Sequence, residues 1–275
     1  MTDAPSTAGE IAKTRGARDL ATIIAISVMA FAIANLLHEG VGHGGACVLT
    51  GGHPRVISSV HFECDQDSRF IAAGGTLVNF MAGFLCWIAL RTVNLTRQHL
   101  RYFLWLLMTV NLLQAGGYFL FSGLGNIGDW AYVIHDLVPA WLWRTGLTVV
   151  GVVSYLLLVW LALLELRPFL GEHDWRRGGA NDLTIVPYVT GGILYTVAGL
   201  FNPVGMILVG VSAGAASFGG TSGMAWMTQY LGSKFAPKIT SQPLALQRSR
   251  GWIIAAFITA TIFVGVLGRG VRLRV

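Results

Sequence analysis

The stretch His38-Glu39-Gly40-Val41-Gly42-His43 decides how this chain is interpreted. It follows an apolar run, Leu20 to Leu37, that is long enough to cross a lipid bilayer. Two imidazoles and a carboxylate are costly to place at the end of a membrane helix, so they indicate a function there. The nearest known pattern is H-E-x-x-H, in which two histidines one helical turn apart bind zinc and the glutamate is a general base.

The two histidines here are one residue further apart than in that pattern. On a regular α-helix, residues i and i+5 point about 140° apart, so His38 and His43 would face different surroundings. A π-helical turn with i→i+5 hydrogen bonds returns them to one side, and Gly40 and Gly42 ease this distortion. HEGVGH also resembles the H-E-x-x-G-H zinc motif of the dipeptidyl peptidase III family. We therefore predict that His38 and His43 bind Zn²⁺ and that Glu39 is the catalytic base.

The composition indicates a polytopic membrane protein. Hydrophobic residues make up 54% of the chain and charged residues 12%, with a mean hydropathy of +0.62. Soluble domains usually carry about a quarter charged residues. The net charge of +6 is spread over loops and termini, which is typical of membrane-flanking segments and excludes a nucleic-acid partner. We predict an all-α bundle of six or seven transmembrane helices within a lipid bilayer.

The chain divides into three parts. Residues 1–18 form a polar tail that we predict to be disordered, residues 19–145 form a core that contains the motif, and residues 146–275 add further transmembrane helices. The first helix is retained, because no cleavage site follows it, and continues to about Thr50. Residues 55–63 predict a short β-hairpin. Further spans are predicted at about 70–93, 102–121, 146–164, 184–201, 203–218 and 252–267.

The three cysteines give no recognisable pattern. Cys47, Cys64 and Cys86 match neither a C-x-x-C zinc site nor a disulfide framework. We expect Cys47 and Cys86 to be packing residues and Cys64 to be an incidental loop residue. The arginine and lysine counts favour a cytoplasmic N-terminus, but seven spans would place a basic C-terminal tail outside, so the sequence leaves the orientation open.

A catalytic zinc site needs a third protein ligand. Asp129 is the best candidate, because it follows a glycine-rich break just after the third predicted span, and such irregular backbone is tolerated in a membrane only inside protein or beside a wet cavity. Asp136 and His135, one to two turns later, are the alternatives. Asp129 could instead cap the helix that begins at Trp130.

Three segments resemble the site-2 family of intramembrane metalloproteases. HEGVGHGGACVLTGGHP looks like the first motif helix of that family, GGTLVNFMAGF resembles its segment of small residues and asparagine, and NLLQAGGYFLFSGLGNIGDW is similar in placement to its N-x-x-P…L-D-G segment. The resemblance covers about residues 20–135. The chain departs from the family by the inserted residue in the motif, by the lack of that proline, and by Gly-Asp-Trp in place of Leu-Asp-Gly.

The resemblance implies a zinc metalloendopeptidase of the plasma (inner) membrane that hydrolyses peptide bonds in or near transmembrane segments. His38, His43 and Asp129 would bind the metal, and Glu39 would transfer protons. The substrate would be a transmembrane protein or peptide. Asn79 and Asn126 are candidates for binding it, although hydrogen bonding within the bundle is the alternative for both.

Two other classes of function remain open at this stage. A catalytically inactive relative would bind transmembrane segments as a chaperone or regulator. A small-solute transporter or channel would use the buried polar residues to line a pathway, and the break at Asn202-Pro203 fits the discontinuous helices of transporters. A diiron enzyme is disfavoured, because the remaining histidines are scattered singly.

Overall fold

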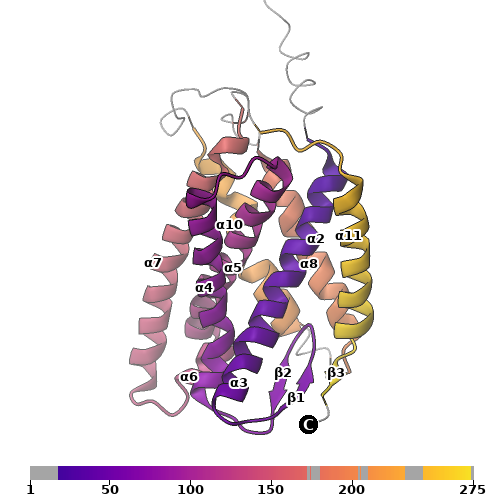
Figure 1. The fold of residues 1–275 in the computed structure, drawn as a ribbon. Coiled ribbons are helices and arrows are strands. Elements are labelled where there is room, and N and C mark those ends of the chain that lie inside the picture. The colour runs from indigo at the N-terminus through magenta and orange to yellow at the C-terminus, as the bar shows by residue number, and fades with distance from the viewer. Residues whose placement is uncertain are drawn as a thin grey trace, which may run out of the picture.

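The protein is described by a computed structural model that covers residues 18–171, 174, 180–203, 205, 210–232 and 244–273. It is mostly helical, and six of its helices are long and apolar enough to cross a membrane. Figure 1 shows these helices as one bundle, with a small sheet of the strands β1, β2 and β3 at its lower end. The predicted helical bundle is therefore confirmed at this level, and a multi-pass membrane protein is compatible with it.

The long helices occupy the segments where the hydropathy predicts them, with shifted boundaries. The third and fourth spans begin earlier than predicted, because amphipathic turns that a hydropathy window omits extend them. After the first helix, the described long helices are α4 (Arg69–Thr92), α5 (Gln98–Gly125), α7 (Ala140–Leu166), α8 (Asn181–Leu200) and α11 (Arg250–Ile262), which the π-helix η6 (Phe263–Leu267) continues. The short helices are α6 (Asp129–Val133) and α10 (Gly223–Trp226). The 3₁₀ turns are η2 (Arg167–Phe169) and η5 (Met227–Tyr230).

The first helix runs without interruption through the motif. It begins at α2 (Leu20–Leu36), where the Asp19 carboxylate caps the helix by accepting from the backbone N–H of Thr22 (2.8 Å). It becomes a π-helix in η1 (Leu37–Gly44) and returns to α-helix in α3 (Gly45–Leu49). Gly51 then turns the chain with φ +80°. The end near Thr50 is confirmed, and the π-helical turn, whose formation the sequence left open, is present.

The predicted hairpin forms and is one strand larger than expected. β1 (Pro54–Ile57) pairs antiparallel with β2 (Phe62–Cys64), and β3 (Val271–Arg272) from the far end of the chain pairs with the other edge of β1. The strand order is β2-β1-β3, so β2 is an edge strand. The sheet thus joins the segment after the first helix to the segment after the last one.

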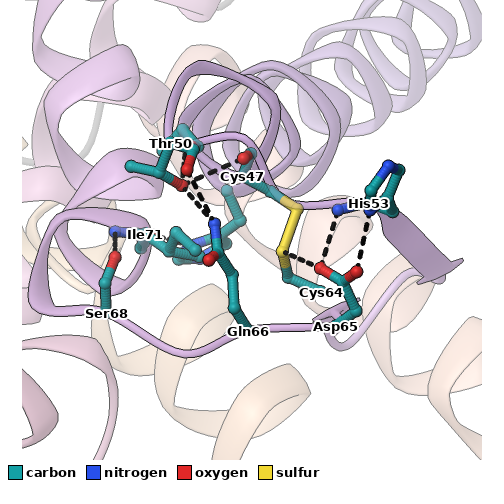
Figure 2. The surroundings of a disulfide bond; sticks show 10 residues. Cys47, Thr50, His53, Cys64, Asp65, Gln66, Ser68 and Ile71 are labelled. Carbon is teal, nitrogen blue, oxygen red and sulfur yellow. Dashed lines mark hydrogen bonds and ion pairs between the residues drawn. A yellow bond between two sulfur atoms is a disulfide. The ribbon is translucent and has the colours of Figure 1, made fainter.

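The interpretation of the cysteines is wrong in one respect. Cys47 in α3 and Cys64 in β2 form a disulfide, which Figure 2 shows beside the turn between helix and hairpin. Sequence reasoning missed it because one cysteine lies in apolar and the other in polar surroundings, and the turn that brings them together has no signature of its own. Gln66 adds to this connection by donating to the Thr50 carbonyl (3.0 Å). Cys86 is free and partly buried, as expected.

The core lies around α5, whose middle is almost fully buried by α2, α4 and α7. The helices beyond residue 145 pack directly on those before it, since α7 lies along α5 and α8 along α2. The segment predicted at 203–218 lies partly outside the described residues. Its described part, η4 (Gly210–Gly219), is a π-helix, and the Gly220 that follows approaches Gln114 of α5, so this segment runs inside the bundle. The predicted disordered tail, 1–18, lies outside the described residues apart from Arg18.

Candidate metal centre

Three predicted ligands meet at one point. His38 and His43 come from η1, and Asp129 is the first residue of α6, held in place by the Gly128 turn with φ +81°. The Nε2 atoms of the two histidines lie 3.2 Å apart. The Oδ2 atom of Asp129 lies 3.2 Å from Nε2 of His38 and 3.5 Å from Nε2 of His43. Widening the helix in η1 is what allows both rings to point to the same carboxylate.

These distances fit a metal ion. Tetrahedral zinc with ligands at about 2.0–2.1 Å separates its ligand atoms by roughly 3.3 Å. The Oδ2 of Asp129 is buried, yet no N–H in the described part of the chain meets it in hydrogen-bond geometry. Burial alone would raise the pKa of Asp129, but the imidazoles of His43 and His38 beside it hold this pKa below its usual value, so the carboxylate is ionised. Two imidazoles and a carboxylate are ordinary zinc ligands.

The two histidine rings are supported differently. The Nδ1–H of His43 donates to the backbone carbonyl of Ile71 in α4 (2.7 Å), which leaves its Nε2 with the lone pair that a metal requires. The ring of His38 stacks on Tyr118 of α5, with centroids 4.8 Å apart. The Nδ1 of His38 is buried and has no hydrogen-bond partner among the described residues. His38 also lines a small chamber, which could hold a hydrogen-bond partner for this nitrogen.

That chamber has a volume of about 10 Å³, and His38 and Glu39 line it. Asn35, Ser59, Gln114 and Tyr195 are among the residues that line it. Two of their polar atoms, Oδ1 of Asn35 and Oγ of Ser59, also have no hydrogen-bond partner in the described part of the chain. The volume and the polar atoms match what one water molecule needs.

Close packing of α4 against η1 depends on glycine. A Cβ atom at Gly75 would lie 2.5 Å from Cε1 of His38 and 2.7 Å from Nε2 of His43. A Cβ atom at Gly42 would lie 2.5 Å from the Cα of Gly75. The two imidazoles thus occupy the space that any side chain at position 75 would fill, so this glycine is part of the centre.

The centre forms the floor of an open cleft. The cleft has a volume of about 570 Å³, and the three predicted ligands and Glu39 all line it. Glu39 is 5% exposed and lines the cleft together with His61. The remaining walls include Tyr118, Phe121, Tyr132 and, from the edge strand β2, Phe62 and Glu63. A carboxylate, a metal-type ligand set and room for a ligand therefore share one cavity.

The other predicted residues lie elsewhere. His135 and Asp136, the alternatives to Asp129, pair with each other (2.8 Å) and are largely exposed, away from the imidazoles. Asn79 is fully buried and its Nδ2 donates to Oε1 of Gln114 (3.4 Å). Asn126 ends α5 in the left-handed conformation, with φ +53°. Neither asparagine lines the cleft, so substrate binding by them stays an untested prediction, and hydrogen bonding within the bundle accounts for Asn79.

Sequence reasoning missed several residues of the centre. Tyr118 stacks on a ligand, the carbonyl of Ile71 orients one, Gly75 makes room for both, and Ser59 lines the chamber. The Gly74-Gly75 pair inside an apolar span was the available signal, since adjacent glycines there indicate close helix contact. The others depend on contacts between distant segments and leave no local pattern.

Comparisons with known proteins add no identification: no family model matches the chain, and neither the curated proteins nor the solved structures include a significant match.

Proposed function

We propose that the protein is an integral membrane zinc metalloprotease that hydrolyses peptide bonds in or near transmembrane segments of its substrates. One observation carries the proposal: His38, His43 and Asp129 converge at ligand spacing in a cleft that also contains the Glu39 carboxylate. This is the combination that metal-assisted hydrolysis needs, a three-ligand site with an acid–base residue beside it.

The chain's own residues have separate roles in this reaction. His38, His43 and Asp129 would hold the ion, and Ile71 orients His43 through its carbonyl. A zinc ion there would supply Lewis-acid activation of water at neutral pH. Glu39 takes a proton from the water as its oxygen attacks the peptide carbonyl carbon and forms the new C–O bond. It then returns this proton to the peptide nitrogen as the C–N bond breaks.

Zinc content tests the ligand set. The purified full chain should contain about one zinc per molecule, and His43→Ala and Asp129→Ala should each lose it, because two remaining ligands do not form a stable site. His135→Ala is the matched control, since this histidine is exposed and distant from the centre. A folded parent without zinc would overturn the metalloprotease proposal and favour transport or binding.

Peptide termini test the reaction. Membranes from cells that express the parent should contain new peptide termini that are absent with Glu39→Gln, because removal of the general base lowers the rate by about 10²–10⁴-fold. Glu39→Gln should keep its zinc. If the parent binds zinc and yields no termini that depend on Glu39, the protein is a metal-containing binding or regulatory relative instead of a protease.

A further inference from the structure

The two ends of the bundle can be told apart by their contacts. At the end where α2 begins, here called the amino end, the N–H of Asp19 donates to the Leu246 carbonyl (2.8 Å) before α11. At the opposite end, here called the cleft end, the N–H of Ser59 donates to the Leu267 carbonyl (3.0 Å) after α11. The cleft end carries the sheet and α6. The cleft lies at this end, because β2, α6 and the turns beside them line it together with parts of η1, α4, α5 and η4.

Basic residues are divided unequally between the segments at these ends. Counted along the sequence, thirteen of the nineteen lysines and arginines lie in, or in the stretches directly adjoining, segments whose described residues are at the amino end, and six lie in or directly adjoining those of the cleft end. The thirteen are Lys13, Arg15, Arg18, Arg91, Arg97, Arg101, Arg167, Arg176, Arg177, Lys234, Lys238, Arg248 and Arg250, and the six are Arg55, Arg69, Arg144, Arg269, Arg272 and Arg274. Because short loops rich in these residues stay in the cytoplasm, the amino end is the cytoplasmic one.

The disulfide gives the same assignment from different chemistry. Cys47 and Cys64 are bonded at the cleft end, and Cys64 lines the cleft itself. Disulfides persist in oxidising compartments and are rare where thioredoxin and glutathione keep thiols reduced. A charge count and a covalent bond, which have no physical cause in common, thus agree on the side to which the cleft opens.

We propose that the cleft opens to the oxidising, non-cytoplasmic side of the membrane and receives its substrate from there. The substrate class follows: a peptide segment at the non-cytoplasmic membrane surface, such as the extracytoplasmic flank of a transmembrane helix. This substrate class rests on the proposed protease function, whereas the direction of the opening does not. The metal and the hydrolytic water also arrive from that side.

Thiol labelling of the full chain in intact cells tests the direction. The background variant Cys86→Ala has no free cysteine, because the remaining two are bonded to each other. Into it we place either His135→Cys, an exposed position at the cleft end, or Thr96→Cys, an exposed position in the turn between α4 and α5 at the amino end. A membrane-impermeant maleimide should label His135→Cys in intact cells and should label Thr96→Cys only after permeabilisation.

The controls separate this proposal from the protease function. The Cys86→Ala background should stay unlabelled until it is reduced, which reports that Cys47 and Cys64 are bonded. Labelling of Thr96→Cys in intact cells, or free thiols at Cys47 and Cys64, would overturn the proposed direction and leave the zinc content unaffected. Conversely, a parent without zinc would overturn the protease function and leave the labelling pattern unchanged.

Discussion

At the scale of single residues, the two histidines differ in what holds their second nitrogen. The Ile71 carbonyl fixes His43, whereas the Nδ1 of His38 has no hydrogen-bond partner among the described residues, and His38 lines the small chamber with Asn35 and Ser59. One water in that chamber would accept from His38 and donate to the two oxygen atoms, and so hold the ring with its Nε2 directed at the metal position. We therefore predict that the chamber contributes to the affinity for the metal.

Removal of the Ser59 hydroxyl tests this role. We predict that Ser59→Ala lowers the zinc affinity about tenfold, because the water loses one of its partners and the His38 ring loses its orientation. Competition with a fluorescent zinc chelator measures the change. Thr184→Val is the matched control, since Thr184 has an equally buried hydroxyl without a partner among the described residues but lies at the amino end. An unchanged affinity in Ser59→Ala would contradict the prediction.

Gly75 provides the second test at this scale. We predict that Gly75→Ala loses the metal, because its Cβ would lie 2.6 Å from Nε2 of His38 and force the imidazoles apart. Zinc content and thermal unfolding of the purified chain measure the effect. Gly45→Ala, in the same helix as the motif with nothing within 4 Å of its Cβ, should keep its zinc. Full zinc occupancy in Gly75→Ala would show that α4 can move away without cost.

The convergence of His38, His43 and Asp129 could be predicted from the sequence, and the contacts that support these side chains could not. His38, Glu39 and His43 form a motif whose residue types and spacing indicate metal binding. Asp129 follows a glycine-rich break in a helix, which a membrane protein tolerates only inside protein or beside a wet cavity. The Ile71 carbonyl, in contrast, belongs to the backbone, which carries no sequence signal at all. The disulfide was missed for a related reason, since it depends on a turn that places two distant cysteines together.

At the scale of elements, the π-helix η1 is a direct consequence of one extra residue. The histidines are five positions apart along the chain, and the i→i+5 hydrogen-bond pattern of the π-helix puts them on one face. The hairpin could be predicted from its β-branched residues, whereas β3 could not, because a strand of two residues has no periodicity and its pairing is with the other end of the chain.

Changing the length of η1 tests this relation. We predict that deletion of Val41, which is 52% exposed, keeps about one zinc per chain, because the motif becomes H-E-x-x-H on a regular α-helix with the flanking helices in register. Insertion of one alanine after Val41 should abolish zinc binding, since neither an α-helix nor a π-helix places residues i and i+6 on one face. Zinc analysis of both variants measures this, and loss of zinc in the deletion would show that the π geometry itself is required.

At the scale of the whole molecule, the outer helices face an apolar environment. Only 28% of the apolar window in the span that contains α7 and 11% of that in the last span are buried within the bundle, so large apolar surfaces point outward. Such surfaces are typical of contact with lipid. Hydropathy predicted these helices, because each is a continuous run. It did not predict which helices would be neighbours, since packing order depends on shape complementarity between distant segments.

The number of passes through the bundle follows from where segments end. α8 begins at the amino end, and the Oγ1 of Thr228 in η5 donates to Oδ1 of Asn181 there (2.8 Å). The chain must therefore return between Leu200 and Thr228, and part of this return is the π-helix η4 beside α8. With the six long helices, this return makes seven passes, which places the first and last described residues, Arg18 and Leu273, at opposite ends of the bundle.

A reporter at each end of the chain tests the seven passes. We predict that a fluorescent protein before Met1 matures in the cytoplasm, and that alkaline phosphatase after Val275 is active, since it requires an oxidising compartment to form its disulfides. Truncation after Gln247, before α11, should abolish the phosphatase activity of the second fusion, because the chain then ends at the amino end. Reporters active on the same side for both full-length fusions would mean an even number of crossings, with the return segment dipping into the membrane and not traversing it.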